Sequence, residues 1–188
     1  MSEEPKDLAA DRAEKVIELQ NAVGAFTTAF AVVESLYLTL ILGLLSTDQP
    51  AMEHIEELMD FSDRLKLMLR LTKDRFPDQL AEAKAINMAG KTLAEHRNRI
   101  AHGAALVASG SFDPGAEFLV GIRKRKSERT VPTGFHWTDD AKGLMQMWFI
   151  TTEEVRVRID EAVALQSIMG TFQLPLQSIR FGTPAPDA

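Results

Sequence analysis

The residues with the clearest chemical potential are Arg97, Asn98 and His102, in the stretch "LAEHRNRIAHGAALVASG" (93–110). Gly103 predicts the end of a helix, so these side chains stand in its last turns. An imidazole that titrates near neutral pH transfers protons, and a guanidinium holds phosphate by paired hydrogen bonds. Such groups can cleave RNA without a metal, by removing the 2′-hydroxyl proton and stabilising charge on phosphorus. The alternative, favoured by spacing alone, is an ordinary helix end whose basic residues complement the helix dipole.

Helical periodicity predicts which way these side chains point. If Ile100 is set at zero, Leu93 and Ile86 fall within about 40° of it and form a stripe for the core. Arg97 lies about 60° away, at the border of that stripe. The outward set lies about 140–180° away and comprises Lys91, Glu95, Asn98 and His102. Asn98 and His102 are therefore neighbours on the outward side of the helix.

The run "EHRNRIAHG" resembles the signature of HEPN domains, in which an arginine, a polar residue and a short spacer precede a histidine near a helix end. The resemblance implies an all-α bundle, usually dimeric, in which the motif helices of two subunits face each other across a cleft. Many such proteins are metal-independent endoribonucleases of toxin–antitoxin, phage-defence and abortive-infection systems.

By this resemblance Arg97 and His102 would be catalytic and Asn98 supporting, with no cofactor and no metal. The implied partners are a second copy of the chain, an RNA substrate and, in a toxin–antitoxin system, an antitoxin protein. The alternative function is a non-catalytic HEPN-like module that binds a nucleotide or a protein.

Two acidic residues are candidates for supporting the motif. Glu34 carries the one charge of the apolar run at 22–46, and a buried carboxylate requires a partner. We expect Glu34 to pair with Arg97 or another motif residue; the alternative is an arginine of the second helix. Glu95 shares the outward face with Asn98 and is the second supporting candidate.

The basic run "IRKRKSER" is a weaker candidate for RNA binding. Its four consecutive cations, which could collect RNA phosphates, are Arg123, Lys124, Arg125 and Lys126. The alternative, slightly favoured, is a solvated hairpin whose charged edges prevent strand pairing. The other histidines form no metal set, since His96 lies near the apolar stripe, on a different face from His102.

The fold that must position these residues is predicted to be mainly α. We expect an up-and-down bundle of four or five helices with a small antiparallel β insert (about 104–150) before the last helix. The predicted helices are 6–45, with a bend or break near Gly24; about 50–75, with a kink near Phe61; 78–102; and 152–172. Thr151 and Glu154 are spaced as a capping box that begins the last helix. Residues 1–173 are expected to form one domain and 174–188 a flexible tail.

Composition restricts the class of protein further. The chain has 188 residues, no cysteine and a formal net charge of −6. Disulfides and thiolate zinc sites are thereby excluded, and nucleic-acid binding requires a local basic patch. The start is acidic and polar, unlike a secretory signal. The run at 22–46 is long enough to cross a bilayer, but its central Glu34 favours a buried helix of a cytoplasmic protein without membrane contact.

Overall fold

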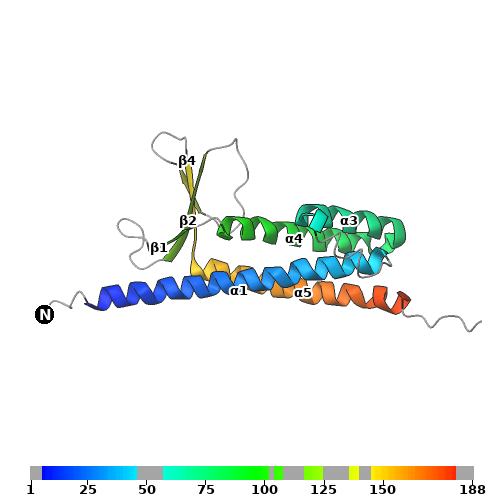
Figure 1. Cartoon of the computed structure of the whole chain (residues 1–188), viewed down its shortest axis with the longest axis horizontal. Coiled ribbons are helices and arrows are strands. Elements are labelled where there is room, and N and C mark those ends of the chain that lie inside the picture. Colours follow the sequence, from blue (N-terminus) through cyan, green and yellow to red (C-terminus); the bar gives the residue numbers. More distant parts are fainter. Residues whose placement is uncertain are drawn as a thin grey trace, which may run out of the picture. The chain divides into compact units, whose positions relative to one another are not determined.

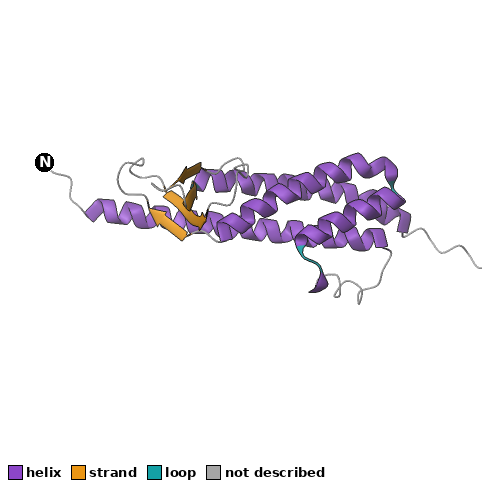
Figure 2. Cartoon of the chain, turned by 90° about the horizontal axis from the view of Figure 1, so that it is seen from above, coloured by secondary structure: helices purple, strands orange, loops and turns teal. Residues whose placement is uncertain are grey.

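The computed structural model of the chain describes residues 6–45, 57–101, 104–107, 117–124, 136–139 and 145–180. In these ranges the protein is mainly α, as predicted (Figures 1 and 2). The helices are α1 (Lys6–Leu45), α3 (Phe61–Arg75), the short 3₁₀ helix η1 (Pro77–Gln79), α4 (Leu80–Ala101) and α5 (Thr152–Arg180).

The chain divides into two compact units. The first unit comprises residues 1–28 and 95–160, and the second comprises residues 29–94 and 161–188. The candidate motif at the end of α4 therefore belongs to the first unit. The prediction of a single domain over 1–173 stays a prediction.

Helix α1 is continuous over 40 residues, so the break expected near Gly24 does not occur. A glycine in a helix interior costs about 1 kcal/mol relative to alanine, which is too little to stop a helix with this many apolar residues. Among the described helices, α1 is the one long and apolar enough to cross a membrane. The core helix of a soluble protein passes the same test, so length and composition do not decide between the two.

Large apolar side chains fill the core of the second unit. The fully buried ones include Phe30, Tyr37, Leu40 and Ile41 from α1, Met68 from α3, Ile86 and Leu93 from α4, and Met169 from α5. Their helical spacing places them on one face of each helix. Hydrogen bonds from side chains to carbonyls on other helices join the same elements. The Tyr37 hydroxyl donates to the Ile86 carbonyl at 2.7 Å, and the Asn87 amide donates to the Leu65 carbonyl at 2.6 Å.

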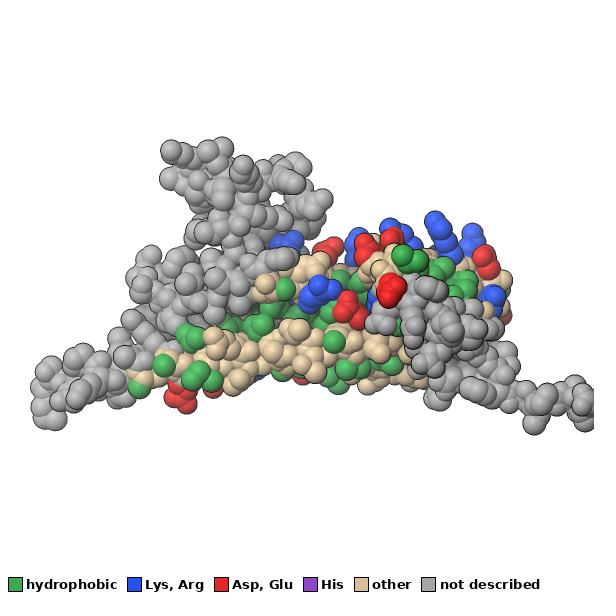
Figure 3. Space-filling model, viewed as in Figure 1, with side chains coloured by type: hydrophobic (Ala, Val, Ile, Leu, Met, Phe, Trp, Pro, Cys, Tyr) green, Lys and Arg blue, Asp and Glu red, His purple; other side chains and the backbone are tan. Residues whose placement is uncertain are grey.

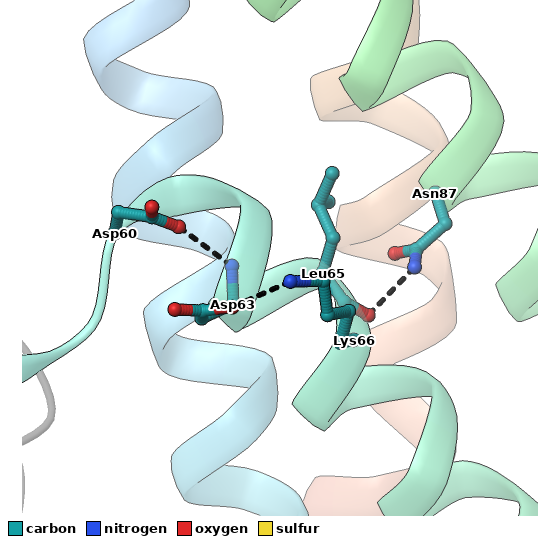
Figure 4. A network of polar contacts seen from close by, with 5 residues as sticks. All are labelled: Asp60, Asp63, Leu65, Lys66 and Asn87. Atoms are coloured by element: carbon teal, nitrogen blue, oxygen red, sulfur yellow. Dashed lines mark hydrogen bonds and ion pairs between the residues drawn. The ribbon is translucent and has the colours of Figure 1, made fainter.

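The kink expected at Phe61 is instead the first turn of a new helix. The Asp60 carboxylate accepts a hydrogen bond from the Asp63 backbone N–H at 2.8 Å, which caps α3 (Figure 4). Lys66 adds an ion pair to Asp63 at 2.7 Å. At the other end the helix stops at Arg75, where the sequence predicted its end, because Phe76 precedes Pro77 and a residue before proline avoids helical angles. The start expected near residue 50 lies outside the described residues.

Replacing Asp60 by alanine is expected to lower the free energy of unfolding by about 1 kcal/mol, because the first turn of α3 loses its cap. Urea denaturation followed by circular dichroism measures the change. Asp60→Asn is the matched control, since its side-chain oxygen accepts the same bond and should retain most of the stability. An equal loss in both variants would show that the cap does not stabilise the helix.

The described strands belong to the first unit and pair antiparallel in the order β1–β2–β4–β3. They are β1 (Ala104–Val107), β2 (Glu117–Lys124), β3 (His136–Asp139) and β4 (Met145–Ile150). Strand β3 lies in a segment rich in turn formers, which disfavour strands. Pairing with β4 accounts for the strand, because it places Trp137 directly opposite Trp148, and β-propensity depends on such neighbours.

The capping box before α5 is confirmed. The Thr151 backbone N–H donates to Glu154 Oε2 at 2.8 Å, and the Glu154 backbone N–H donates to Thr151 Oγ1 at 3.2 Å. The helix then continues past the predicted end at Phe172, through Pro175, to Arg180. The first part of the predicted tail (174–188) is therefore helical, although a proline removes one helical N–H donor. Residues 181–188 lie outside the described residues.

Candidate functional site

The candidate motif occupies the last turns of α4, whose last residue is Ala101. His102 and Gly103 lie outside the described residues, so the position of the imidazole stays a prediction. Arg97 and Asn98 are described. The helix that carries them is continuous over 22 residues, and one side of it is anchored by buried apolar side chains.

The predicted faces of α4 are confirmed. Ile86, Leu93 and Ile100 are each at most 3% exposed and form the buried stripe. The residues expected on the outward face and described by the structure, all of them exposed, are Lys91, Glu95 and Asn98. Arg97 is half-buried, as its border position predicts. Arg97 and Asn98 therefore belong to different parts of the helix surface, and Asn98 is accessible to a ligand from solvent.

A second polar cluster, which sequence reasoning missed, lies on the inward side of the same turns. His96 is fully buried, and Arg158 of α5, in the same unit, is 7% exposed. Arg99 is half-buried, and its Nη1 atom is itself buried. The three side chains place two guanidinium charges near one imidazole in the interior of the first unit.

The surroundings keep His96 neutral. Burial, together with the positive charges of Arg158 and Arg99, lowers the pKa of its imidazole to about 4. At neutral pH His96 is therefore an uncharged group, unsuited to serve as the general acid. The one signal that could have found this cluster is in α5, where Arg158 occupies an inward position of the helical stripe formed by Val155, Ala162 and Leu165.

The two candidate supporting acids, Glu95 and Glu34, lie in different units. Glu95 is exposed on α4, in the first unit with Arg97. Glu34 is half-buried on the part of α1 that belongs to the second unit. The predicted pairing of Glu34 with Arg97 joins residues of different units and stays a prediction.

The basic run is only partly described. Arg123 and Lys124 end β2, where they pair in register with Gln146 and Met145 of β4. Arg125 and Lys126 lie outside the described residues. The backbone pairing agrees with the hairpin interpretation of this segment and says nothing about RNA binding.

Within the described residues, no three His, Cys, Asp or Glu side chains come together as a metal site would require. Comparison with known proteins adds no relative: no protein-family model, no curated protein and no solved structure matches the chain. A functional assignment therefore depends on the motif at the end of α4 and on the geometry of the first unit.

Proposed function

We propose that the protein is a metal-independent endoribonuclease of HEPN type that acts as a homodimer. The observation that carries the proposal is the orientation of the motif. Asn98 is exposed and Arg97 half-buried at the end of a helix held in place by Ile100 and Leu93. A rigid helix that presents such groups at its end is a suitable support for phosphate chemistry.

In the proposed mechanism, His102 removes the proton from the 2′-hydroxyl and later protonates the leaving 5′-oxygen. Arg97 binds the scissile phosphate and stabilises the charge that builds up in the transition state. Asn98 orients one of these groups by hydrogen bonding. The 2′-oxygen displaces the 5′-oxygen from phosphorus, so the products carry a 2′,3′-cyclic phosphate and a 5′-hydroxyl. A second copy would complete the cleft, with Glu95 beside it and Glu34 as a further supporting acid.

Several finer features belong to the same proposal. Residues 104–150 would form a small antiparallel insert in an up-and-down bundle; the pairing of the four described strands supports this. The basic run at 123–126 would be a secondary contact with RNA. We place the protein in the cytoplasm, without membrane contact, in a toxin–antitoxin or phage-defence system whose antitoxin would be a protein partner.

The test is RNA cleavage by the purified protein in the presence of EDTA. Arg97→Ala and His102→Ala are each expected to slow cleavage by about 100-fold, because a general acid–base group or a transition-state donor is lost. Mass spectrometry should find 2′,3′-cyclic phosphate ends. Lys91→Ala is the matched control, since Lys91 is an exposed cation on the outward face of α4 but outside the motif.

The outcomes separate the candidate functions. Cleavage that survives both motif substitutions, or that falls equally in Lys91→Ala, contradicts the proposed roles. RNA or nucleotide binding without cleavage supports the non-catalytic module. Circular dichroism of each variant checks that the helical fold is retained.

A further inference from the structure

Helix α3, in the second unit, is basic although the protein as a whole is acidic. Its 15 residues contain five cationic and two acidic side chains, a net charge of +3, whereas the whole chain has a net charge of −6. An acidic protein needs a local basic patch to bind a polyanion. The cations of α3 are separated by apolar residues in the sequence, so they come together only when the helix forms.

Contacts with two neighbouring helices decide which side of α3 is covered. The Asn87 amide of α4 donates to the Leu65 carbonyl at 2.6 Å, as Figure 4 shows. The Phe61 ring packs against a tyrosine of α1, and the Arg75 guanidinium donates to a carbonyl in the last turn of that helix. If Leu65 is set at zero, Phe61 and Arg75 lie about 40–80° to one side of it. Helix α1 therefore covers that side of α3, and α4 lies next to Leu65.

Three cations lie on the opposite side of α3 from α1. Lys66, Arg70 and Lys73 are about 80–140° from Leu65 in the other rotational direction, and all three are exposed. They span about 10 Å along the helix. Figure 3 shows Lys and Arg side chains (blue) projecting from the surface at the place where Figure 1 draws α3. Cations therefore line the outer side of α3 next to α4.

Helix α4 adds a fourth cation beside them. The short η1 connects the two helices, so α4 runs back along α3, and Lys84 lies opposite Met68. With Asn87 set at zero, Lys84 lies about 60° to one side, whereas Gly90, which lies against α1, is about 60° to the other. Lys84 is exposed, and Lys91 lies further along α4, opposite the first residue of α3 and outside this group. The four cations, which we call the α3–α4 basic face, are Lys66, Arg70, Lys73 and Lys84.

Most of the charge of the α3–α4 basic face is not neutralised by the described residues. Lys66 pairs with Asp63 at 2.7 Å, but both side chains are exposed, and such a pair contributes little. Within the described part of the chain, neither Arg70, Lys73 nor Lys84 forms an ion pair. Three positive charges are therefore available to an anion that approaches from solvent.

We propose that the α3–α4 basic face binds the phosphate backbone of RNA, at a site separate from the cleavage motif. Lys and Arg side chains are the main contacts to phosphate, and the attraction acts through charge without a precise fit. The choice of RNA as the polyanion rests on the proposed function, in which RNA is the substrate. The α3–α4 basic face would hold a part of the strand that is not being cut, independently of its sequence.

The chemistry of this face fits RNA better than a membrane or an acidic protein. Of the large apolar residues of α3 and α4, two helices that the structure describes throughout, only Met88 is exposed. A helix that lies on a membrane inserts a row of apolar side chains among the lipids. The centre of a protein interface is apolar and poor in lysine. Exposed cations with one apolar neighbour are instead typical of phosphate contact.

Fluorescence anisotropy with a labelled single-stranded RNA and the full chain tests the proposal. All riboses of the RNA are 2′-O-methylated, so it is not cleaved and binding is measured separately from catalysis. Each cation that contacts a phosphate is expected to contribute about 0.7 to the slope of the logarithm of affinity against the logarithm of salt concentration. Replacing Arg70, Lys73 and Lys84 together by glutamine should make the slope shallower by about 2 and weaken binding about 100-fold at about 0.1 M salt.

Two controls separate charge at this face from other effects. The triple variant Arg70→Lys, Lys73→Arg, Lys84→Arg keeps all three charges and should retain the affinity and the slope of the wild type. Arg156→Gln removes an exposed cation of α5 in the first unit and should leave the slope unchanged. Glutamine is a good helix former, and circular dichroism checks that each variant keeps its helices.

A wild-type protein that does not bind this RNA overturns the inference, as does a glutamine variant that binds with the slope of the wild type. Binding to vesicles of anionic phospholipid but not to RNA would assign the face to a membrane and overturns it as well. Salt-dependent RNA binding that the glutamine variant loses, in a protein that cleaves no RNA, supports the α3–α4 basic face and contradicts only the proposed ribonuclease.

Discussion

Replacing Gly90 by alanine is expected to destabilise the protein by about 3 kcal/mol, although alanine is the better helix former. A Cβ at position 90 would lie 2.9 Å from Cε2 and 3.0 Å from Cζ of Tyr37, and closer still to its hydroxyl. That ring is fully buried and packs edge-on against Phe61 with centroids 5.2 Å apart, so it has little freedom to move.

The magnitude combines three effects. Overpacking a filled core costs about 2 kcal/mol. Displacing Tyr37 from the Ile86 carbonyl leaves a buried hydroxyl unpaired, which costs about 2 kcal/mol more. The higher helix propensity of alanine stabilises the folded protein by about 1 kcal/mol and offsets part of this loss. Urea denaturation followed by circular dichroism measures the net loss.

Two controls isolate the contact. Gly24→Ala should be neutral or stabilising by up to about 1 kcal/mol, because nothing lies within 4 Å of the added atom. Gly90→Ala combined with Tyr37→Phe should cost less than the sum of the single substitutions, because the nearest atom is then absent. If Gly90→Ala proves as harmless as Gly24→Ala, the packing of Tyr37 on α4 is not as the structure shows.

Acid is expected to destabilise the protein through His96. In the unfolded chain this imidazole binds a proton below about pH 6.5, whereas in the folded protein its pKa is lowered to about 4. The unfolded state therefore holds more protons between these values, and stability falls as the pH falls through that window. Because the pKa of His96 is about 4 in the folded protein and 6.5 in the unfolded chain, the loss of folding free energy is about 3 kcal/mol and is complete near pH 4.

The measurement is the free energy of unfolding at several pH values between 7 and 4. His96→Gln removes the titrating group, so its stability should fall less steeply with acid than that of the wild type. Carboxylates contribute to both slopes, and the difference between the two proteins isolates His96. Arg156→Gln is the matched control on α5, because Arg156 is exposed and does not contribute to the pKa shift. Parallel curves for the wild type and His96→Gln would contradict the buried, neutral imidazole.

Local signals predicted the ends of helices well. The spacing of Thr151 and Glu154 gave the start of α5, and Phe76 before Pro77 gave the end of α3. Capping and proline geometry involve neighbours along the chain, so the sequence contains the whole interaction. The start of α3 was misinterpreted as a kink because Asp60 was not recognised as a cap.

The faces of the motif helix were also predicted from the sequence, because they depend on residues close together along the chain. Helical periodicity alone placed Asn98 outward and Ile100 inward, since both follow from about 100° per residue. Periodicity does not say what a border residue contacts. It placed His96 near the core, but the pKa of this imidazole is lowered by its full burial and by the charge of Arg158 on α5, which the sequence separates widely from α4.

By itself the sequence determined the mainly α class, the ends of several helices and the sides of α4, because these features depend on residues within one or two helical turns. Only the tertiary structure decided that Gly90 rather than Gly24 is constrained, and that His96 is buried close to the charges of two arginines. The physical reason is that packing, desolvation and charge interactions depend on side chains brought together from distant parts of the chain.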